Sequence, residues 1–385
     1  MPNVSARLPR FPWDRLKPYA AKADAHPGGR VDLSVGTPVD PTPESVRRAL
    51  SAAADSPGYP TTHGTARLRE AASGWMRREH GAAVDPVSVL PLIGSKELVA
   101  ALPALLGLGA GDAVAFPTPA YPTYEIGALL SGATPVPVSD GDLLNRWLAP
   151  GGAAEQISAA PQNLRLLWLN SPGNPHGRVH SADVLREIVG WARARGVIVV
   201  SDECYLSLGW EGTEPVSVLN PQVCGGSHDG LLAVHSLSKR SNLAGYRSAF
   251  LTGDPALVAE LLEVRKHAGM MMPGPVQAAT AAALDDDEYA AAQKERYRSR
   301  RTVLRTALAD ASFRIDHSEA GLYLWASRIA DGEPEACWDT VAHLADLGIL
   351  AAPGEFYGPG GEYHVRVALT ATDERIAAAA ARLAG

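Results

Sequence analysis

The 385-residue chain has few cysteines, no excess of positive charge and no long apolar run. Cys204, Cys224 and Cys337 lie far apart and lack the CxxC spacing of zinc or redox sites, so we expect reduced thiols that serve packing. The formal net charge of −7 argues against a nucleic-acid partner, because nucleic-acid binders usually carry a basic patch. A local basic pocket for a small anion is still compatible with this charge.

We expect no targeting signal in the first residues of the sequence. Its first residues, MPNVSARLPRFPWDRLKPYA, contain charges and prolines throughout and have no apolar core of a signal peptide. The longest uncharged apolar stretch, 98–111, is too short and too broken by Pro103 and glycines to cross a bilayer, so we expect a buried helix there. We therefore expect a cytoplasmic protein without a membrane partner.

What the chain does contain is enough apolar sequence for a sizeable core. Apolar residues make up 46% and charged residues 20%, which is typical of a soluble globular protein. A length of 385 residues suits two domains, or one large α/β body with a smaller satellite.

From Val31 onward, short apolar runs alternate with longer amphipathic ones, which is typical of a largely parallel sheet covered by helices. The apolar runs predict strands at 89–94, 113–117, 134–138, 164–170, 197–203, 231–236 and 248–253. The amphipathic runs predict helices at 65–80, 96–106, 181–195 and 255–268. These elements predict a large α/β domain over residues 45–275.

The sequence changes character after Pro275. A long charged helix is predicted at 288–309, followed by an apolar stretch at 321–327, a helix at 334–347 and a strand at 363–369. We expect a smaller α+β domain over 276–385, with residues 1–44 forming an N-terminal arm and part of this domain. The proline-rich first forty residues are expected to pack on the small lobe or on a partner chain.

Polar stretches follow several predicted strands, at the edge where open α/β sheets bind ligands. The four stretches are GSKE (94–97), NSPGNPHG (170–177), SDECY (201–205) and HSLSKRSNLAGYR (235–247). The first joins a strand to a helix, so its backbone N–H groups and the helix dipole predict an anion site.

In their order and spacing these stretches resemble the class I/II pyridoxal-phosphate-dependent aminotransferases of fold type I. The shared pattern is Asn-Pro-x-Gly, Asp-x-x-Tyr, Ser-x-Ser-Lys, an arginine eight residues after that lysine, and a C-terminal arginine on a strand. The resemblance extends from SVGTP (34–38) to VRVALT (365–370). It implies an α/β fold with a mostly parallel seven-stranded sheet between helices, a smaller α+β domain, pyridoxal 5'-phosphate as cofactor, and no metal.

The resemblance implies a catalytic role for three residues. Lys239 would form a Schiff base with the cofactor aldehyde and, once released by substrate, act as the base that moves a proton. Asp202 would keep the pyridine nitrogen protonated, so that the ring becomes an electron sink. Tyr205, together with Asn174, would hydrogen-bond the phenolic oxygen of the cofactor.

It also implies how the cofactor phosphate is held. The donors would be the backbone of Ser95 and Lys96, the hydroxyls of Ser236 and Ser238, and the planar guanidinium of Arg247.

Tyr121, in PAYPTY, would stack on the cofactor ring, although a purely structural core aromatic is the alternative. Tyr59, in SPGYPTTHG, resembles the tyrosine that reaches the phosphate of the neighbouring subunit, so the resemblance implies a homodimer with composite sites.

Three residues are implied in substrate binding: Gly36, Asn174 and Arg366. Arg366 lies in the apolar strand YHVRVAL, where an unpaired charge would be expensive, and the substrate α-carboxylate would be its partner. Gly36 would offer a backbone N–H at close approach. One departure is His176, which replaces the usual threonine of Asn-Pro-Thr-Gly and could belong to a pocket or only to the turn.

A finer resemblance points to actinobacterial N-succinyldiaminopimelate aminotransferases. It rests on LPRFPWDRLKPYAAKA, DLSVGTPVDPTP, KHAGMMMPGPVQAA and PGEFYGPGGEYHVRVALTATDERI, which are largely loops and edges, where substrate choice is usually determined. The implied reaction exchanges an amino group between glutamate and N-succinyl-2-amino-6-oxopimelate, in lysine and diaminopimelate biosynthesis. It needs a second cation for the distal carboxylate, which the sequence does not identify.

Three alternatives stay open. An aminotransferase for aspartate or an aromatic amino acid would use the same cofactor residues. A fold type I C–S lyase would use Lys239 for elimination. A non-enzymatic cofactor-binding regulator would need a DNA-binding domain, for which we see no room ahead of residue 31.

Overall fold

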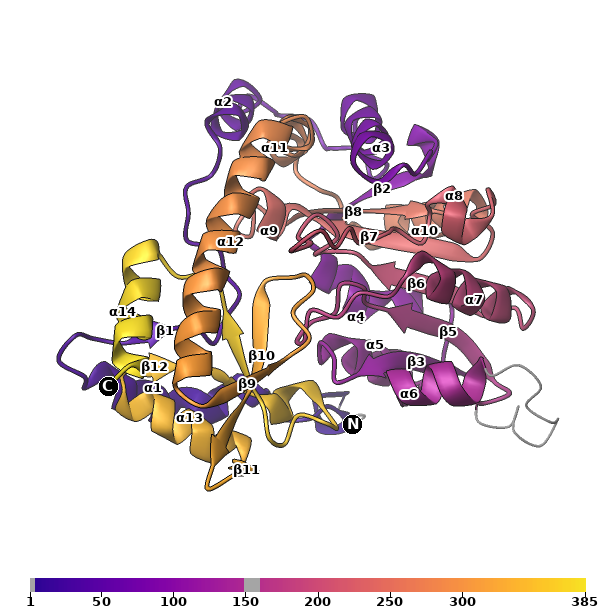
Figure 1. The fold of residues 1–385 in the computed structure, drawn as a ribbon. Helices are drawn as coiled ribbons and strands as arrows, with labels where there is room; N and C mark the ends of the chain where they lie inside the picture. Colours follow the sequence, from indigo (N-terminus) through magenta and orange to yellow (C-terminus); the bar gives the residue numbers. More distant parts are fainter. Residues whose placement is uncertain (1–3, 149–159) are drawn as a thin grey trace.

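Seven strands form the central sheet of the computed structural model, which describes residues 4–148 and 160–385 (Figure 1). Their order across the sheet is β2-β8-β7-β6-β5-β3-β4. All neighbours are parallel except β8, which runs antiparallel to both β2 and β7. The strands are β2 (Val89–Ile93), β3 (Ala113–Thr118), β4 (Thr134–Ser139), β5 (Leu164–Leu169), β6 (Ile198–Asp202), β7 (Leu231–Ser236) and β8 (Ser248–Gly253). Each lies at a predicted strand, and the mostly parallel α/β sheet is confirmed.

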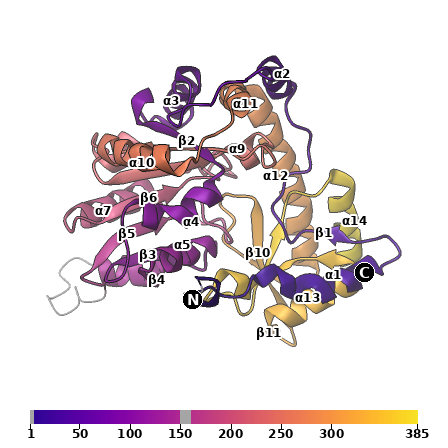
Figure 2. The same cartoon turned by 180° about the vertical axis from the view of Figure 1, so that it is seen from behind.

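Side chains of alternating residues enter two separate cores, one on each face of the sheet. In β7, Leu231 and Ala233 join the core under α3, α7 and α11, whereas Leu232 and Val234 join the core under α4, α5 and α10 (Figures 1 and 2). Strands buried on both faces read as continuous apolar runs, which is why the sequence showed them clearly. The helices of this lobe are α2 (Glu44–Ala52), α3 (Ala66–His80), α4 (Ser95–Leu105), α5 (Thr123–Ser131), α6 (Asp140–Asp142), α7 (Ala182–Arg193), α8 (Pro221–Cys224), α9 (Leu237–Arg240), α10 (Pro255–Ala268) and α11 (Gly274–Leu284).

The buried helix expected at 98–111 is shorter than predicted and begins earlier. Helix α4 starts at Ser95 and ends at Leu105, and Gly107 then adopts a positive φ of 74°. The glycines that follow are turn residues, because only glycine adopts such a conformation without strain.

The second lobe is built on an antiparallel sheet. Its strand order is β11-β10-β14-β13, with β9 also paired to β10. The elements are β9 (Phe313–Asp316), β10 (Tyr323–Ala330), β11 (Glu333–Pro334), α13 (Cys337–Asp346), β12 (Ile349–Leu350), β13 (Ala352–Pro353), β14 (Val365–Ala368) and α14 (Asp373–Leu383).

The N-terminal residues pack on this second lobe, which is one of the two positions expected for them. Helix α1 (Lys17–Asp24) contacts α13, and β1 (Val31–Asp32) pairs in parallel with β12. Short helical turns complete the chain: η1 (Val4–Arg7), η2 (Pro12–Leu16), η3 (Pro86–Ser88), η4 (Leu143–Trp147) and η6 (Gly354–Tyr357). The domain boundaries at 44/45 and 275/276 stay predictions.

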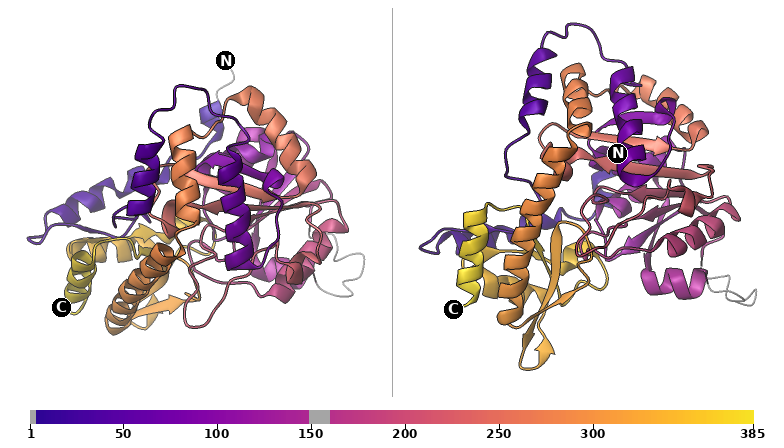
Figure 3. Two further views of the ribbon diagram at one scale, coloured as in Figure 1. Left: turned by 90° about the horizontal axis from the view of Figure 1, so that it is seen from above. Right: turned by 45° about the horizontal axis from the view of Figure 1, so that its top comes forward.

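Helix α12 (Asp287–Asp310) connects the two lobes and contacts α9 at one end and α14 and β9 further along (Figure 3). The sequence predicted a charged helix at this place. The structure buries one side of it, including the charged Arg300 and Arg301. Two buried arginines need partners, and the partners of Arg300 are described below.

Within 4–148 and 160–385, no helix is both long enough and apolar enough to span a membrane.

Candidate active site

Lys239 lies in α9, directly after the carboxyl end of strand β7. Its Nζ donates a hydrogen bond to the carbonyl oxygen of Gly36, in the N-terminal segment. Burial lowers the pKa of the Lys239 amine. A lower pKa increases the fraction of neutral amine, which is the nucleophilic form.

Asp202 ends the neighbouring strand β6 and is buried. Its Oδ2 accepts a hydrogen bond from the hydroxyl of Tyr124 (2.8 Å), and its Oδ1 accepts one from the backbone N–H of Cys204 (3.2 Å). Burial raises the pKa of the Asp202 carboxyl, while these hydrogen bonds act in the opposite direction. A buried carboxylate of this kind is suited to pair with a cationic ring nitrogen.

The turn from β2 into α4 is the place where an anion site was predicted. Gly94 precedes the helix with φ 78°, and Ser95 is the first helical residue. The guanidinium of Arg247 lies so close that a Cβ on Gly94 would be 2.2 Å from its Nη2. Glycine is therefore required, and the exposed Arg247 adds a charged donor to the backbone N–H groups of the helix start.

Two predicted phosphate ligands lie together at the start of α9. The hydroxyl of Ser236 donates to that of Ser238 (3.0 Å) and accepts from the backbone N–H of Ser238 (3.2 Å). Lys96 has an exposed side chain, so only its backbone suits the predicted role. The phosphate assignments stay predictions.

Arg366 lies in β14 and is 4% exposed. Its Nη1 donates to Oδ1 of Asn174 (3.0 Å), and its Nη2 donates to the carbonyl oxygen of Ser34 (2.9 Å). Nε of the same guanidinium is buried and has no hydrogen-bond partner among the residues that the structure describes. The arginine is therefore oriented by protein oxygens but keeps a donor that a carboxylate ligand could use.

Tyr323, in β10, packs against this arginine from one side. The guanidinium carbon of Arg366 lies 3.8 Å from the centre of the Tyr323 ring, and the Tyr323 hydroxyl lies 3.2 Å from that of Tyr205. A Cβ on Gly36 would be 2.1 Å from the Tyr323 hydroxyl, so glycine is required there as well. Although burial raises the pKa of Tyr323, the charges of Arg366 and Lys239 lower it below its ordinary value.

The two remaining tyrosines of the prediction differ in exposure. Tyr121 is half-buried, edge-on to Tyr124 at 6.0 Å between ring centres, and burial raises its pKa to about 12. Tyr59 is 96% exposed in the single chain. A contact of Tyr59 with a second subunit stays a prediction, as does stacking by Tyr121.

His176 belongs both to a turn and to a cavity lining. Its Nδ1 accepts a hydrogen bond from the backbone N–H of Arg178 (3.1 Å), and its ring lies 5.6 Å from that of His317. It also lines a small cavity with Asp140 and His180. Burial lowers the pKa of His176 to about 4, so the ring is neutral near pH 7.

The three cysteines are free thiols. Cys224 and Cys337 are buried, in agreement with a packing role, whereas the thiol of Cys204 contacts the hydroxyl of Ser95 (3.5 Å) at the candidate site. Across the described part of the chain, no group of three or more His, Cys, Asp or Glu side chains could hold a metal ion.

Sequence reasoning missed Tyr124, Tyr323 and Ser34. Tyr124 could have been found, because it is the second tyrosine of PAYPTY, three residues after Tyr121 at the start of a helix. The contact of Tyr323 with Arg366 can be recognised only from the strand pairing. Arg366 is opposite Trp325, and Tyr323 lies two residues from Trp325 on the same face of the sheet. Ser34 acts through its carbonyl oxygen, for which a sequence holds no signal.

The residues of the candidate site are linked by these contacts and lie together at the carboxyl edge of the large sheet. The site combines an anion-binding helix start, a buried carboxylate, an amine of lowered pKa and a buried arginine with a free donor. This set suits a ligand that carries a phosphate, a ring nitrogen and a carbonyl group, together with a second ligand that carries a carboxylate.

Residues 29–383 match the family model of "Aminotransferase class I and II". The chain is 58% identical, over 98% of its length and 99% of the relative's, to the 4-dedimethylamino-4-oxo-anhydrotetracycline transaminase OxyQ of Streptomyces rimosus. It is also 58% identical to the probable aminotransferase Rv1178 of Mycobacterium tuberculosis, over 99% of this chain and 86% of that one.

Among solved structures, the chain resembles the N-succinyldiaminopimelate aminotransferase from Mycobacterium tuberculosis. The TM-score is 0.81 at 28% identity, and the likeness covers 96% of this chain and 98% of that one.

Proposed function

The chain belongs to the class I and II aminotransferases, which use pyridoxal 5'-phosphate, and within this family we propose that it is a succinyldiaminopimelate transaminase. The reaction would move an amino group between glutamate and N-succinyl-2-amino-6-oxopimelate. Amino transfer is preferred over C–S elimination and over a non-enzymatic regulator because the similar relatives are named as a transaminase and a probable aminotransferase.

The single observation that carries the amino-acid half of this proposal is Arg366. A buried guanidinium that keeps an unpaired Nε is suited to hold the α-carboxylate of an amino or keto acid. The choice of the succinylated acceptor is supported by the sequence resemblance in the loops and by the likeness to the mycobacterial enzyme.

The described residues fit the cofactor. The corner of Gly94, Ser95 and Arg247 would hold its phosphate, Asp202 its ring nitrogen and Lys239 its aldehyde. Bound there, the cofactor supplies a carbonyl that takes up the amino group and a ring that stabilises negative charge at the substrate α-carbon.

The protein side of the reaction follows from the same geometry. Arg366 would orient the α-carboxylate, so that the α-carbon hydrogen faces the Lys239 amine. The Nζ of Lys239 would move that proton between the substrate α-carbon and the cofactor, and its lowered pKa increases the fraction of amine that is free to accept a proton. Tyr205 and Asn174 would hold the cofactor's phenolic oxygen. Tyr59 from a second subunit would complete the phosphate site in a homodimer.

A second candidate function is supported by the 58% identity to OxyQ. Under it, the acceptor would be the 4-oxo group of an anhydrotetracycline, with an amino acid still serving as donor. Arg366 is compatible with both, because the donor carries the α-carboxylate in either case.

The test begins with the absorbance of the purified, cofactor-loaded protein. Addition of glutamate should bleach the yellow band, and 2-oxoglutarate should restore it. The kcat/KM values are then compared for N-succinyl-2-amino-6-oxopimelate, 4-dedimethylamino-4-oxo-anhydrotetracycline, oxaloacetate and an aromatic keto acid. We expect the succinylated acceptor to lead by at least about a hundredfold, the ratio that a few kcal/mol of specific contacts gives. A higher value for any other acceptor would refute the proposal and name the substrate class instead.

A further inference from the structure

The segment between Gly36 and Pro43 is unusually stiff. Its sequence, Gly-Thr-Pro-Val-Asp-Pro-Thr-Pro, places three prolines in eight residues. Each proline fixes its own φ and restricts the residue before it, so few backbone angles in this segment are free. Between Gly36 and Asp40, Pro38 has a fixed φ, and Thr37 and Asp40 are restricted because each precedes a proline, so a constraint applied at Asp40 limits the position of Gly36.

The near end of this proline segment, residues 36–43, meets the active site. The carbonyl oxygen of Gly36 accepts from Nζ of Lys239, and the residue packs against the Tyr323 hydroxyl. Two residues earlier, the carbonyl of Ser34 accepts from Arg366 (2.9 Å). The segment thus contributes to the place where the substrate carboxylate is expected.

The middle of the segment, at Asp40 and Pro41, is held by α12. Arg300 donates from Nη1 and Nη2 to the two carboxylate oxygens of Asp40 (2.8 and 2.7 Å), and Gln293 donates to the same carboxylate (2.8 Å). The side chains of Arg300 and Asp40 are only 3% and 9% exposed. Tyr289 adds a hydrogen bond to the carbonyl of Pro41 (2.5 Å). A bidentate pair shielded from water is the strong form of this interaction.

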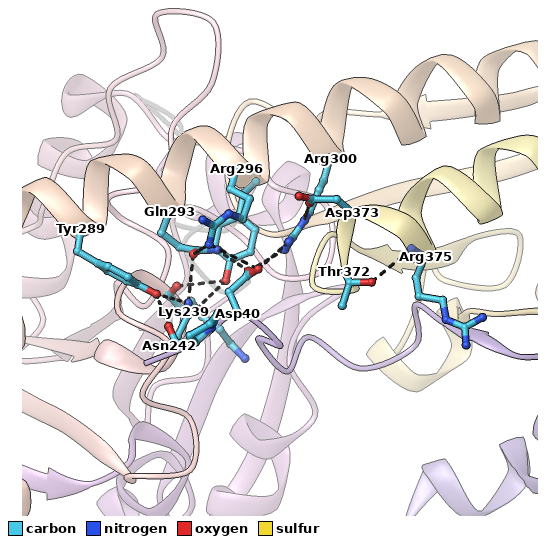
Figure 4. A network of polar contacts seen from close by, with 12 residues as sticks. Asp40, Lys239, Asn242, Tyr289, Gln293, Arg296, Arg300, Thr372, Asp373 and Arg375 are labelled. Atoms are coloured by element: carbon cyan, nitrogen blue, oxygen red, sulfur yellow. Dashed lines mark hydrogen bonds and ion pairs between the residues drawn. The ribbon is translucent and has the colours of Figure 1, made fainter. Parts of the chain in front are cut away.

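The same side of α12 also holds the lysine segment. Nδ2 of Asn242, three residues after Lys239, donates to Gln293 (3.1 Å), and the Tyr297 hydroxyl donates to Oδ1 of Asn242 (3.1 Å). Figure 4 shows these side chains converging from one side of the helix on Asp40 and on the Lys239 segment. Residues 289, 293, 297 and 300 are spaced three or four apart, as residues on one helix face must be.

We propose that Asp40 and Arg300 are positioning residues that hold the proline segment, and with it Gly36 and Ser34, in register with Lys239 and Arg366 for binding the substrate α-carboxylate. The proline segment and the Lys239 segment would then both be held in place by the same face of helix α12. The proposal rests on transamination of an amino acid and applies to either acceptor discussed above.

The charge state of Asp40 is consistent with this role. Burial alone would raise the pKa of its carboxyl, but hydrogen bonds from Arg300 and Gln293 hold the pKa below its ordinary value. Arg300 has one more partner, Asp373 of α14, which accepts from Nε (2.6 Å) and is 68% exposed. Because exposed ion pairs contribute little, Asp373→Asn is a matched control that leaves the Asp40 pair in place.

The first test measures hydrogen exchange of residues 34–40 in the cofactor-loaded protein, without substrate. Asp40→Asn weakens the pair, and Pro38→Gly loosens the segment without disturbing a buried charge. Both should speed exchange of the buried Ser34 amide, whose N–H donates to Oδ1 of Asp32 (3.0 Å), by about tenfold or more, as expected for local opening made easier by about 1.4 kcal/mol. Asp373→Asn should leave exchange unchanged. Unchanged exchange in both test variants would overturn the proposal.

The second test compares L-glutamate with 4-aminobutyrate, which lacks the α-carboxylate, in the half-reaction followed by cofactor absorbance. In both test variants, the apparent affinity for glutamate should fall about tenfold, with the saturating rate nearly kept, since a misplaced binding group mainly weakens binding. Reaction with 4-aminobutyrate should change less than about twofold, because no α-carboxylate contact is lost. Equal losses for both amines would indicate general damage and contradict the proposal. If the unaltered enzyme does not react with glutamate, the proposed donor is wrong, and hydrogen exchange decides the positioning role by itself.

Discussion

The cofactor side and the carboxylate side of the active site are built in different ways. On the cofactor side, Lys239, Asp202 and the Gly94 corner each sit at the end of a strand of one sheet, so the sheet alone fixes their relative positions. On the carboxylate side, Arg366 and Tyr323 lie on paired strands of the second lobe, and Gly36 is brought to them from the N-terminal segment. The first side is therefore a local feature of each strand end, whereas the second depends on how the two lobes and α12 are held together.

The largest effect should come from the cofactor side. Lys239→Ala removes the only group assigned to proton transfer, so we expect kcat to fall by at least about a thousandfold. Steady-state transamination measures this, with Lys266→Ala, an exposed lysine paired with Glu263, as the control. A Lys239→Ala enzyme that still turns over well would mean that the two sides have been assigned wrongly.

Arg366→Gln tests the carboxylate side. Removing the buried cation should lower kcat/KM for the amino donor by about a hundredfold, mainly through KM, as loss of a buried charge contact typically costs a few kcal/mol. The visible absorbance of the bound cofactor should stay, because the cofactor side is intact. Arg314→Gln, on strand β9 of the same lobe and 55% exposed, is the control. Loss of the cofactor from Arg366→Gln would show that the two sides are not separable.

Tyr124→Phe should have a smaller effect, confined to the cofactor side. It removes one hydrogen bond to Asp202, worth about 1 kcal/mol, so cofactor affinity should drop by about fivefold. Dialysis followed by absorbance measures the affinity, and the exposed Tyr363→Phe serves for comparison. An unchanged affinity would mean that Asp202 does not depend on this tyrosine.

Acid should destabilise the buried region between helix α3 and strand β7 of the large lobe. His80 and His235 stack there at 6.3 Å between ring centres. Burial, with a contribution from Arg240, lowers the pKa of His80 to about 3, and burial lowers the pKa of His235 as well. Both are neutral in the folded state but bind protons when unfolded, so the free energy of unfolding falls as pH drops below 6.5. Glu203 acts in the opposite direction, because burial raises its pKa to about 7.

Denaturant unfolding at pH 7.5 and 5.5 measures this effect. His80→Gln should reduce the acid-induced loss by about 1 kcal/mol, whereas the exposed His267→Gln should not. An equal pH dependence in both variants would show that His80 titrates freely in the folded protein.

The same contrast between the two sides explains which structural features could be predicted from the sequence and which could not. All seven sheet strands were predicted. Apart from the edge strand β4 they are largely buried and read as apolar runs, and the residues at their ends follow immediately in the chain. Tyr323 and Ser34 were missed because a strand register or a backbone carbonyl brings them to Arg366. Helix α12 was predicted only as a long charged helix, since nothing in its local pattern shows that Arg300 meets a carboxylate 260 residues earlier.

The proline segment has a practical consequence for changing what this enzyme accepts. Val35 and Val39 are 46% and 50% exposed, and they lie next to residues whose positions are fixed by Arg366, Lys239 and Arg300. A library at these two valines would vary exposed side chains next to the residues that contact Arg366 and Lys239, while the supporting backbone stays constant. Screening such a library offers a route to new acceptors that leaves every catalytic group in its native place.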